Sequence, residues 1–217
     1  MSRVALVTGN DTGVGKTRVA ASLAIALAPL GSIRYVKLVE TGIVNEAESD
    51  AYKVEALAKG ALDSRVVVRS YREPLAPVAA AAREGTKLRL QELVSEFRKA
   101  RGSAWTIVEG AGGLAVPLDP SGADWRDFAM MVPVDAVIVV LENRLGAINQ
   151  MRLLEPYCQP LSMPCGFWLN EARVQGMATI HTNEEALLSS TIPTWAKQRH
   201  GEEPTNLDLS WSSENTG

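Results

Sequence analysis

The residues best suited to chemistry lie near the start of the chain, where an apolar run passes into a glycine-rich turn. The run at about 3–8 predicts a buried strand, and the turn after it contains Gly13, Gly15, Lys16 and Thr17. A phosphate chain is bound by converging backbone N–H groups, by a lysine that neutralises its charge, and by a hydroxyl that ligates Mg²⁺. The segment therefore predicts a phosphate-binding loop between a strand and a helix.

This loop departs from the general pattern G-x-x-x-x-G-K-[ST] at its first position, where Asn10 replaces glycine. Asparagine adopts positive φ more readily than most residues, and Gly9 is adjacent to it. An ordinary surface turn is the alternative interpretation. The strand before the turn and the helix after it favour phosphate binding.

Two further segments carry polar groups at the ends of predicted strands. Glu109 ends a strand and opens a glycine-rich turn, which is where a carboxylate could position Mg²⁺ beside a phosphate loop. Lys37 and Thr41 place a second cation and a hydroxyl on the same edge of the sheet. The alternatives are a solvated turn for the glutamate and an exposed strand end for the lysine.

Two helix starts are less specific. Asp50 precedes a helical pattern, and its carboxylate could simply cap that helix. The residues 146–149 open another helix after a buried strand, so their free N–H groups could bind an anion. Every α/β protein has such helix starts, and spacing alone does not make either of these a site.

The order of these segments fits one α/β domain. Apolar runs alternate with helical patterns, which predicts a mostly parallel, twisted sheet with helices on both faces. Strands 104–109 and 135–141 are apolar throughout and are expected at its centre. The other strands are expected at 3–8, 33–38, 65–69 and 165–169, and helices at 15–29, 50–60, 87–101, 124–132 and 145–156, with a helix start after Pro77.

The domain is assigned to residues 1–200 and a polar tail to 201–217. From Glu202 onward the composition predicts poor order, which leaves Trp211 unexplained.

The formal charge of −3 and the lack of a basic stretch argue against nucleic acid as a partner. Neither a signal peptide nor a membrane-length apolar run is recognisable, so we expect a cytoplasmic protein without a membrane partner. The spacing of Cys158 and Cys165 favours neither a zinc site nor a disulfide framework.

Four blocks, 8–17, 37–42, 109–118 and 144–149, together resemble the dethiobiotin synthetase family of P-loop NTPases. The resemblance implies an ATP- and Mg²⁺-dependent reaction of 7,8-diaminononanoate with CO₂. One amine takes up CO₂ as a carbamate, the carbamate attacks the γ-phosphoryl group, and the second amine closes a urea ring on the mixed anhydride.

The resemblance also implies roles for individual residues. The phosphate loop and reacting centre fall on Thr12, Gly13, Val14, Gly15, Lys16 and Thr17, together with Lys37. The metal ligands fall on Thr17, Asp50 and Glu109. The diamine site falls on Thr41 and Gly112, and the substrate carboxylate meets a helix start of the other subunit of a homodimer, here Gly146, Ala147, Ile148 and Asn149. The nucleobase falls beside Asn170 and Pro193.

Some positions differ from the family pattern. Leu38 replaces a usual proline, and the matches around Asn170 and Pro193 are short, which leaves the preference among nucleoside triphosphates open. A partition or septum-positioning ATPase is the main alternative, but its loop carries an early lysine where this chain has Asp11. Amidotransferase-type synthetases continue into a glutaminase domain, which we do not expect here because neither cysteine has a suitable catalytic context.

Overall fold

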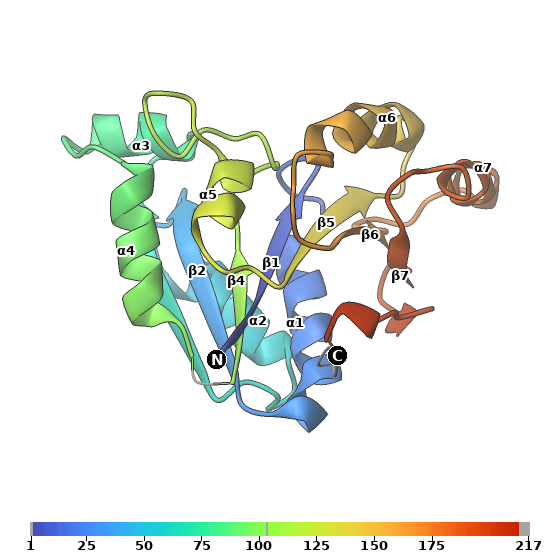
Figure 1. Cartoon of the computed structure of the whole chain (residues 1–217), viewed down its shortest axis with the longest axis horizontal. Coiled ribbons are helices and arrows are strands. Elements are labelled where there is room, and N and C mark those ends of the chain that lie inside the picture. The colour runs from blue at the N-terminus through green and yellow to red at the C-terminus, as the bar shows by residue number, and fades with distance from the viewer. Residues whose placement is uncertain (1, 103, 213–217) are drawn as a thin grey trace.

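An eight-stranded sheet forms the centre of the molecule (Figure 1). The computed structural model describes residues 2–102 and 104–212. The strand order is β3-β2-β4-β1-β5-β6-β7-β8, and every neighbouring pair is parallel except β7 and β8. The strands are β1 (Arg3–Gly9), β2 (Ile33–Thr41), β3 (Ser64–Tyr71), β4 (Trp105–Glu109), β5 (Ala136–Glu142), β6 (Cys165–Asn170), β7 (Thr194–Gln198) and β8 (Pro204–Thr205).

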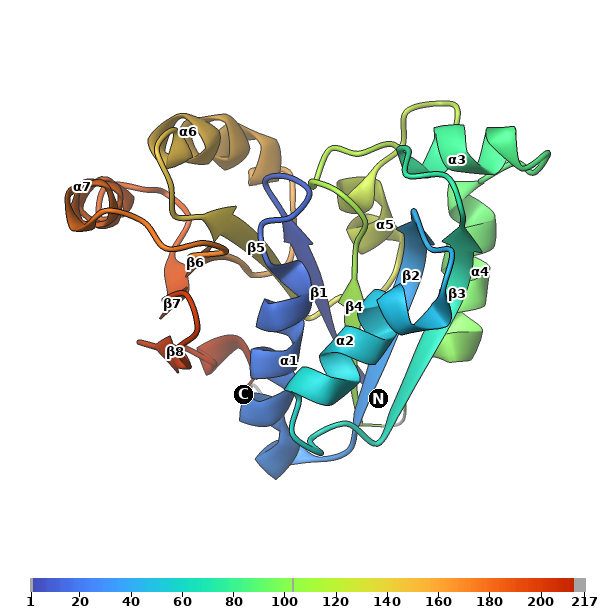
Figure 2. The same cartoon turned by 180° about the vertical axis from the view of Figure 1, so that it is seen from behind.

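Helices cover both faces of this sheet, as Figures 1 and 2 show from opposite sides. Successive residues of β1 enter two different cores, Val4 on one face and Ala5 on the other. The face seen in Figure 2 carries α1 (Lys16–Leu27) and α2 (Asp50–Leu57). The other helices are α3 (Pro77–Arg83), α4 (Leu90–Ala100), α5 (Trp125–Met131), α6 (Ala147–Cys158) and α7 (Met177–Leu187), with short 3₁₀ turns η1 (Ala28–Leu30), η2 (Glu46–Glu48) and η3 (Ser210–Ser212).

The predicted fold class is confirmed, and β4 and β5 flank β1 at the centre as expected. Each predicted strand and helix is present with small shifts at its ends, and α3 begins at Pro77. The sequence analysis missed α7, β7 and β8. The α7 segment is rich in threonine and polar residues, and β7 and β8 lie at one edge of the sheet, so none has the long apolar pattern of a central element. Within the described residues, no helix combines the length and apolar composition needed to cross a bilayer.

The expectation of a poorly ordered segment from Glu202 is wrong for residues 204–212. Trp211 packs edge-on against Trp105, with 5.9 Å between ring centroids, and beside Trp195 at 5.6 Å. Arg3 lies over the Trp105 ring and donates a hydrogen bond to the Trp211 carbonyl at 2.8 Å. The segment is polar in overall composition, but Leu207, Leu209 and Trp211 alternate with its polar residues. These three side chains pack against the core on the α1 side of the sheet. Residues 213–217 of the expected tail lie outside the described residues.

Candidate active site

The glycine-rich loop joins the end of β1 to the start of α1. Gly13 and Gly15 have φ values of 77° and 94°, a region that side chains with a Cβ rarely adopt. A Cβ on Gly15 would lie 2.2 Å from the Asn170 amide nitrogen, so only glycine fits there. Helix α1 begins at Lys16, and its first N–H groups have no partners within the helix. The loop therefore presents backbone N–H donors at the carboxyl end of β1, in the middle of the sheet.

Lys16 crosses the mouth of this loop. Its side chain is largely buried, and Nζ donates to the Asp11 carbonyl at 2.7 Å. Burial, together with the nearby Lys37 ammonium, lowers the pKa of Lys16 to about 8. A phosphate placed in the loop would stabilise the charged form of this lysine.

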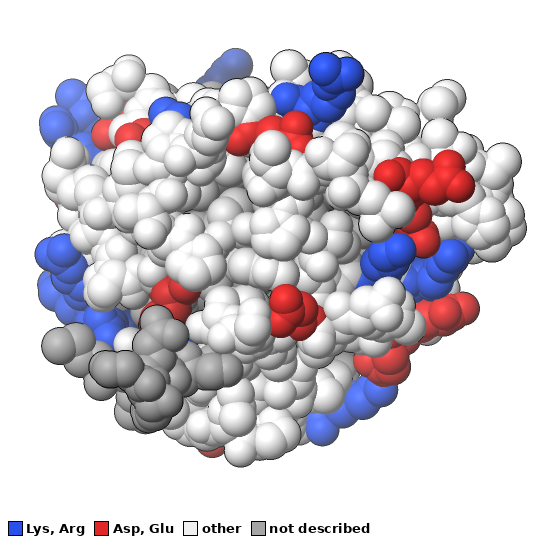
Figure 3. All heavy atoms as spheres, turned by 45° about the vertical axis from the view of Figure 1, so that its right-hand side comes forward, with Lys and Arg blue, Asp and Glu red and all other residues white. Residues whose placement is uncertain are grey.

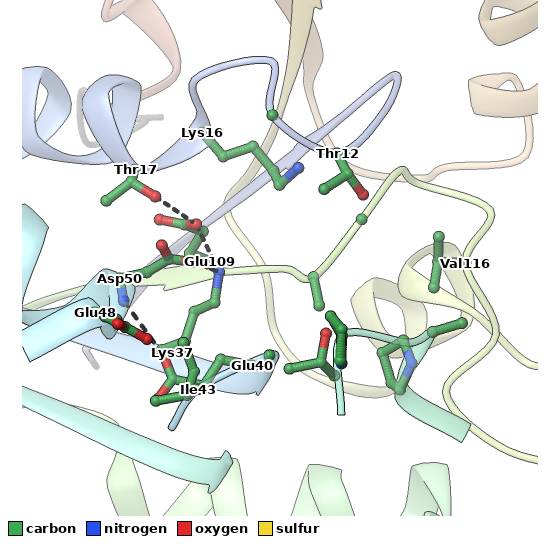
Figure 4. A pocket seen from close by; sticks show the side chains of 18 of the residues that line it. Thr12, Lys16, Thr17, Lys37, Glu40, Ile43, Glu48, Asp50, Glu109 and Val116 are labelled. Carbon is green, nitrogen blue, oxygen red and sulfur yellow. Dashed lines mark hydrogen bonds and ion pairs between the residues drawn. The ribbon is translucent and has the colours of Figure 1, made fainter. Parts of the chain in front are cut away.

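A buried cluster of opposite charges lies below the loop (Figure 4). Lys37 Nζ is 2.7 Å from Glu109 Oε1 and 2.6 Å from Asp50 Oδ2. Thr17 Oγ1 donates to Glu109 Oε1 at 3.1 Å, and the Tyr35 hydroxyl donates to Oε2 at 2.8 Å. Lys37 is 2% exposed and Glu109 is 1% exposed. These contacts hold one ammonium group between two carboxylates.

The electrostatics of the cluster favour its charged form. Burial opposes the charge on Lys37, but Glu109 and Asp50 outweigh it and raise the pKa of this lysine. Burial likewise opposes ionisation of Asp50, yet Lys37 lowers the pKa of that carboxyl below its usual value. Burial and the neighbouring Glu109 raise the pKa of Tyr35, which stays a hydrogen-bond donor.

The sheet register explains why these groups meet. Lys37 and Glu109 are directly paired across β2 and β4, and Tyr35 is two residues before Lys37 on the same side of β2. Asp50 comes from the start of α2, which packs over that side. Asp50 does not cap this helix, since the N-cap is Ser49, whose hydroxyl accepts a hydrogen bond from Ala51 N at 3.1 Å.

Two of the three predicted metal ligands, Asp50 and Glu109, thus converge on a single cation, the Lys37 ammonium, and Thr17 joins them through its hydrogen bond to Glu109. Two carboxylates and a hydroxyl are the hard oxygen donors that Mg²⁺ prefers. The structure therefore fits the metal chemically, with Thr17, Asp50 and Glu109 as its protein donors. In the part of the chain that the structure describes, no group of three or more His, Cys, Asp or Glu side chains could hold a metal, so water and nucleotide phosphate oxygens would complete the coordination.

A cavity of about 780 Å³ opens over this cluster. It brings together predicted residues from four separate segments: Thr12, Gly13, Gly15, Lys16 and Thr17 from the loop, Lys37 and Thr41 from β2, Asp50 from α2, and Glu109 and Gly112 from β4 and the turn after it.

Tyr35 and Glu40 are buried polar residues near this cavity that the sequence analysis did not identify as candidates. Alternation from Lys37 would put Glu40 on the opposite face of β2, but Leu38 and Val39 both enter the same core. The alternation is interrupted there, and Glu40 lines the cavity beside Asp50.

The predicted nucleobase residues do not line this cavity. Asn170 is completely buried, and its amide nitrogen donates to the Val14 carbonyl at 2.7 Å, beneath the loop. Its Oδ1 is buried without a hydrogen-bond partner. Pro193 precedes β7, and its carbonyl accepts a hydrogen bond from Phe167 N at 2.8 Å. Asn170 therefore supports the loop in this conformation, and a contact with a base would require its side chain to turn.

The predicted carboxylate-binding residues 146–149 also lie apart from the cavity. They follow β5 and open α6, where Gly146 has a φ of 97°. Gly146 and Ile148 line a separate hollow of about 430 Å³ against α7. Leu145, just before them, is 84% exposed. This chain alone does not bring α6 to the phosphate loop cavity.

Comparisons with known proteins identify the family of the chain. A family model described as an AAA domain matches residues 3–155. The chain is 40% identical over 165 residues to the ATP-dependent dethiobiotin synthetase of Mycobacteroides abscessus, which is 75% of this chain and 70% of the relative. It is 34% identical over 196 residues to the enzyme of the same name from Mycobacterium avium, which is 89% of this chain and 85% of the relative.

A solved structure of a plasmid partition protein from Borrelia burgdorferi has a TM-score of 0.58 and 13% identity, covering 91% of this chain and 89% of that one. This likeness shows a shared fold alone. The sequence identities to the synthetases are far higher and span most of both chains. The chain therefore belongs to the family of ATP-dependent dethiobiotin synthetases.

Proposed function

We propose that the protein converts 7,8-diaminononanoate, CO₂ and ATP into dethiobiotin, ADP and phosphate, with Mg²⁺ as cofactor. The observation that carries the proposal is the meeting of Lys16, Lys37, Asp50 and Glu109 in the cavity that Gly13, Gly15 and Thr17 of the phosphate loop also line. Membership of the synthetase family supports the same reaction.

The chain's contribution to this reaction is positioning and charge neutralisation, which is what phosphoryl transfer requires. The loop amides and Lys16 would hold the β- and γ-phosphates. Bound Mg²⁺, held by Thr17, Asp50 and Glu109, would supply further positive charge there. Lys37 lies at the same centre, where its ammonium would stabilise a carbamate oxygen as that oxygen attacks the γ-phosphorus and ADP leaves.

Ring closure would follow in the same cavity. The second amine attacks the carbonyl carbon of the carbamic-phosphoric anhydride, phosphate leaves, and a five-membered urea ring forms. Thr12 from the loop and Thr41 from the end of β2 both line this cavity. We propose that their hydroxyl groups orient the amines.

We further propose a homodimer with composite sites. The start of α6 lies apart from its own chain's cavity, and the exposed Leu145 stands beside it. On the side of the molecule that carries α6 and α7, uncharged residues cover most of the surface, with a few acidic side chains among them (Figure 3). Such a surface suits contact with a second copy. The α6 N–H groups would then hold the substrate carboxylate of the partner's site.

The proposal also includes tolerance among nucleoside triphosphates and a cytoplasmic location. Asn170 is engaged beneath the loop, so affinity would come mainly from phosphate contacts. Cys158 and Cys165 are free thiols, which suits a reducing compartment.

The decisive experiment is dethiobiotin formation from the diamine, bicarbonate and ATP with purified protein, followed by mass spectrometry. Product that depends on all three substrates would support the proposal. ATP hydrolysis that is stimulated by DNA or membranes, without formation of dethiobiotin, would instead favour a partition or septum-positioning ATPase.

A further inference from the structure

Glu40 is a buried carboxylate that the proposed chemistry leaves without a role. It lies near the end of β2 and is 4% exposed. Its Oε2 accepts hydrogen bonds from the Ser49 hydroxyl at 2.9 Å and from the Asp50 backbone N–H at 3.3 Å. No ion pair within the described residues includes Glu40.

These two contacts tie the first turn of α2 to β2. The Ser49 hydroxyl donates to Glu40 and accepts from Ala51 N, so the hydroxyl links the strand to the helix. Two of the N–H groups that a helix start leaves unpaired, those of Asp50 and Ala51, are thereby satisfied.

The consequence falls on Asp50, the first residue of α2. Its backbone is held by Glu40, and its carboxylate reaches Lys37 at 2.6 Å. Strand β2 therefore fixes Asp50 at both its main chain and its side chain. A carboxylate on an untethered helix start would lose the orientation that it needs to meet Glu109 around one cation.

We propose that Glu40 is a positioning residue, which holds Asp50 in the geometry that a divalent cation requires. This inference rests on the proposed metal site of the synthetase. It assigns Glu40 a role through hydrogen bonds rather than through its charge. The competing interpretation is that the charge of Glu40 acts directly on the cation or on substrate amines, since the residue lines the same cavity.

Two substitutions separate these interpretations. Glu40→Gln keeps an oxygen that can accept both hydrogen bonds but removes the charge, whereas Glu40→Met keeps the volume and removes both. Mn²⁺ affinity, measured by electron paramagnetic resonance with ADP and without diamine, is the readout. We expect Glu40→Met to weaken Mn²⁺ binding about 10- to 100-fold, as lost outer contacts of metal ligands do. The Mn²⁺ affinity of Glu40→Gln should stay within about threefold of that of the wild type, because the outer contacts of the metal ligand are kept.

The matched control is Glu48→Ala, which removes one negative charge from an exposed position at the cavity rim. It should bind Mn²⁺ like the wild type. In steady-state assays of Glu40→Met, the KM for Mg²⁺ should rise more than kcat falls, because added metal restores occupancy. Circular dichroism of each variant verifies its fold.

A Glu40→Gln variant that binds Mn²⁺ as weakly as Glu40→Met would overturn the positioning role and assign the effect to charge. Wild-type affinity in Glu40→Met would overturn it as well. If Glu40→Met does not fold, Ser49→Ala removes the shorter link to α2 while keeping the charge of Glu40, and unchanged Mn²⁺ affinity in that variant would refute the inference. Because these measurements use no diamine, they are independent of whether dethiobiotin is the product.

Discussion

Lys37 provides the sharpest test of the buried cluster, because it neutralises two carboxylates at once. Replacing it by methionine keeps the volume of the side chain but removes the ammonium group that forms an ion pair with Glu109. Among the ion pairs of the described residues, Asp50 has one other lysine partner, Lys53. The Lys53 Nζ is 3.4 Å from Asp50 Oδ1, and the Lys53 side chain is more than half exposed. We therefore expect Lys37→Met to destabilise the metal-free protein strongly.

The magnitude follows from burial. Removing one partner of a buried ion pair costs about 3–5 kcal/mol, because the remaining charge stays uncompensated. At about 2–4 °C per kcal/mol for a domain of this size, Tm should fall by roughly 6–20 °C in EDTA. Mg²⁺ should reverse much of this loss, since a divalent cation can take the place of the ammonium. At a hundredfold excess over its Kd it would contribute about 2.7 kcal/mol.

Differential scanning fluorimetry with EDTA and with Mg²⁺ would measure both effects, and Lys53→Met is the control. Lys53 contacts the same Asp50, but its side chain is 53% exposed. Its replacement should therefore lower the free energy of unfolding by less than about 1 kcal/mol. The reasoning would be refuted if Lys37→Met melted within about 2 °C of wild type in EDTA, or if Mg²⁺ raised the Tm of both proteins equally.

The remaining predictions concern binding and turnover. Lys16→Ala should lower kcat by about 10²–10³, the scale for a lost charge-stabilising donor, and near wild-type turnover would remove this lysine from the mechanism. Because phosphate binds the ammonium form of Lys16, whose pKa is about 8 in the free protein, ADP affinity measured calorimetrically in EDTA should be level below that pH and fall above it. An affinity that is flat from about pH 7 to about pH 10 would contradict this sign. ATP, GTP and CTP should bind within about a hundredfold of one another, roughly 2.7 kcal/mol, and a larger preference for ATP in calorimetry would show base selection. Gly146→Pro should raise the KM for the diamine much more than that for ATP, since it removes an N–H at the start of α6, and a fully active monomer in sedimentation would exclude the composite site.

The sequence by itself determined the features that depend on a few neighbouring residues. Gly13 and Gly15 adopt positive φ before a helix that begins at Lys16, as the loop pattern predicts. The continuous apolar runs of β4 and β5 indicated central strands, because only strands covered on both faces lack polar alternation. The family resemblance rested on these same local blocks and is confirmed by the relatives.

The tertiary structure alone decided which side chains meet. Lys37 and Glu109 are 72 residues apart in sequence and become neighbours because β2 pairs with β4. Glu40 reaches α2 only because the alternation of β2 is interrupted after Lys37. The sequence assigned Trp211 to a polar tail, whereas in the structure its ring packs against those of Trp105 and Trp195. Backbone preferences act over a turn or a few strand residues, whereas strand order and docking depend on burying the apolar faces of the whole chain together.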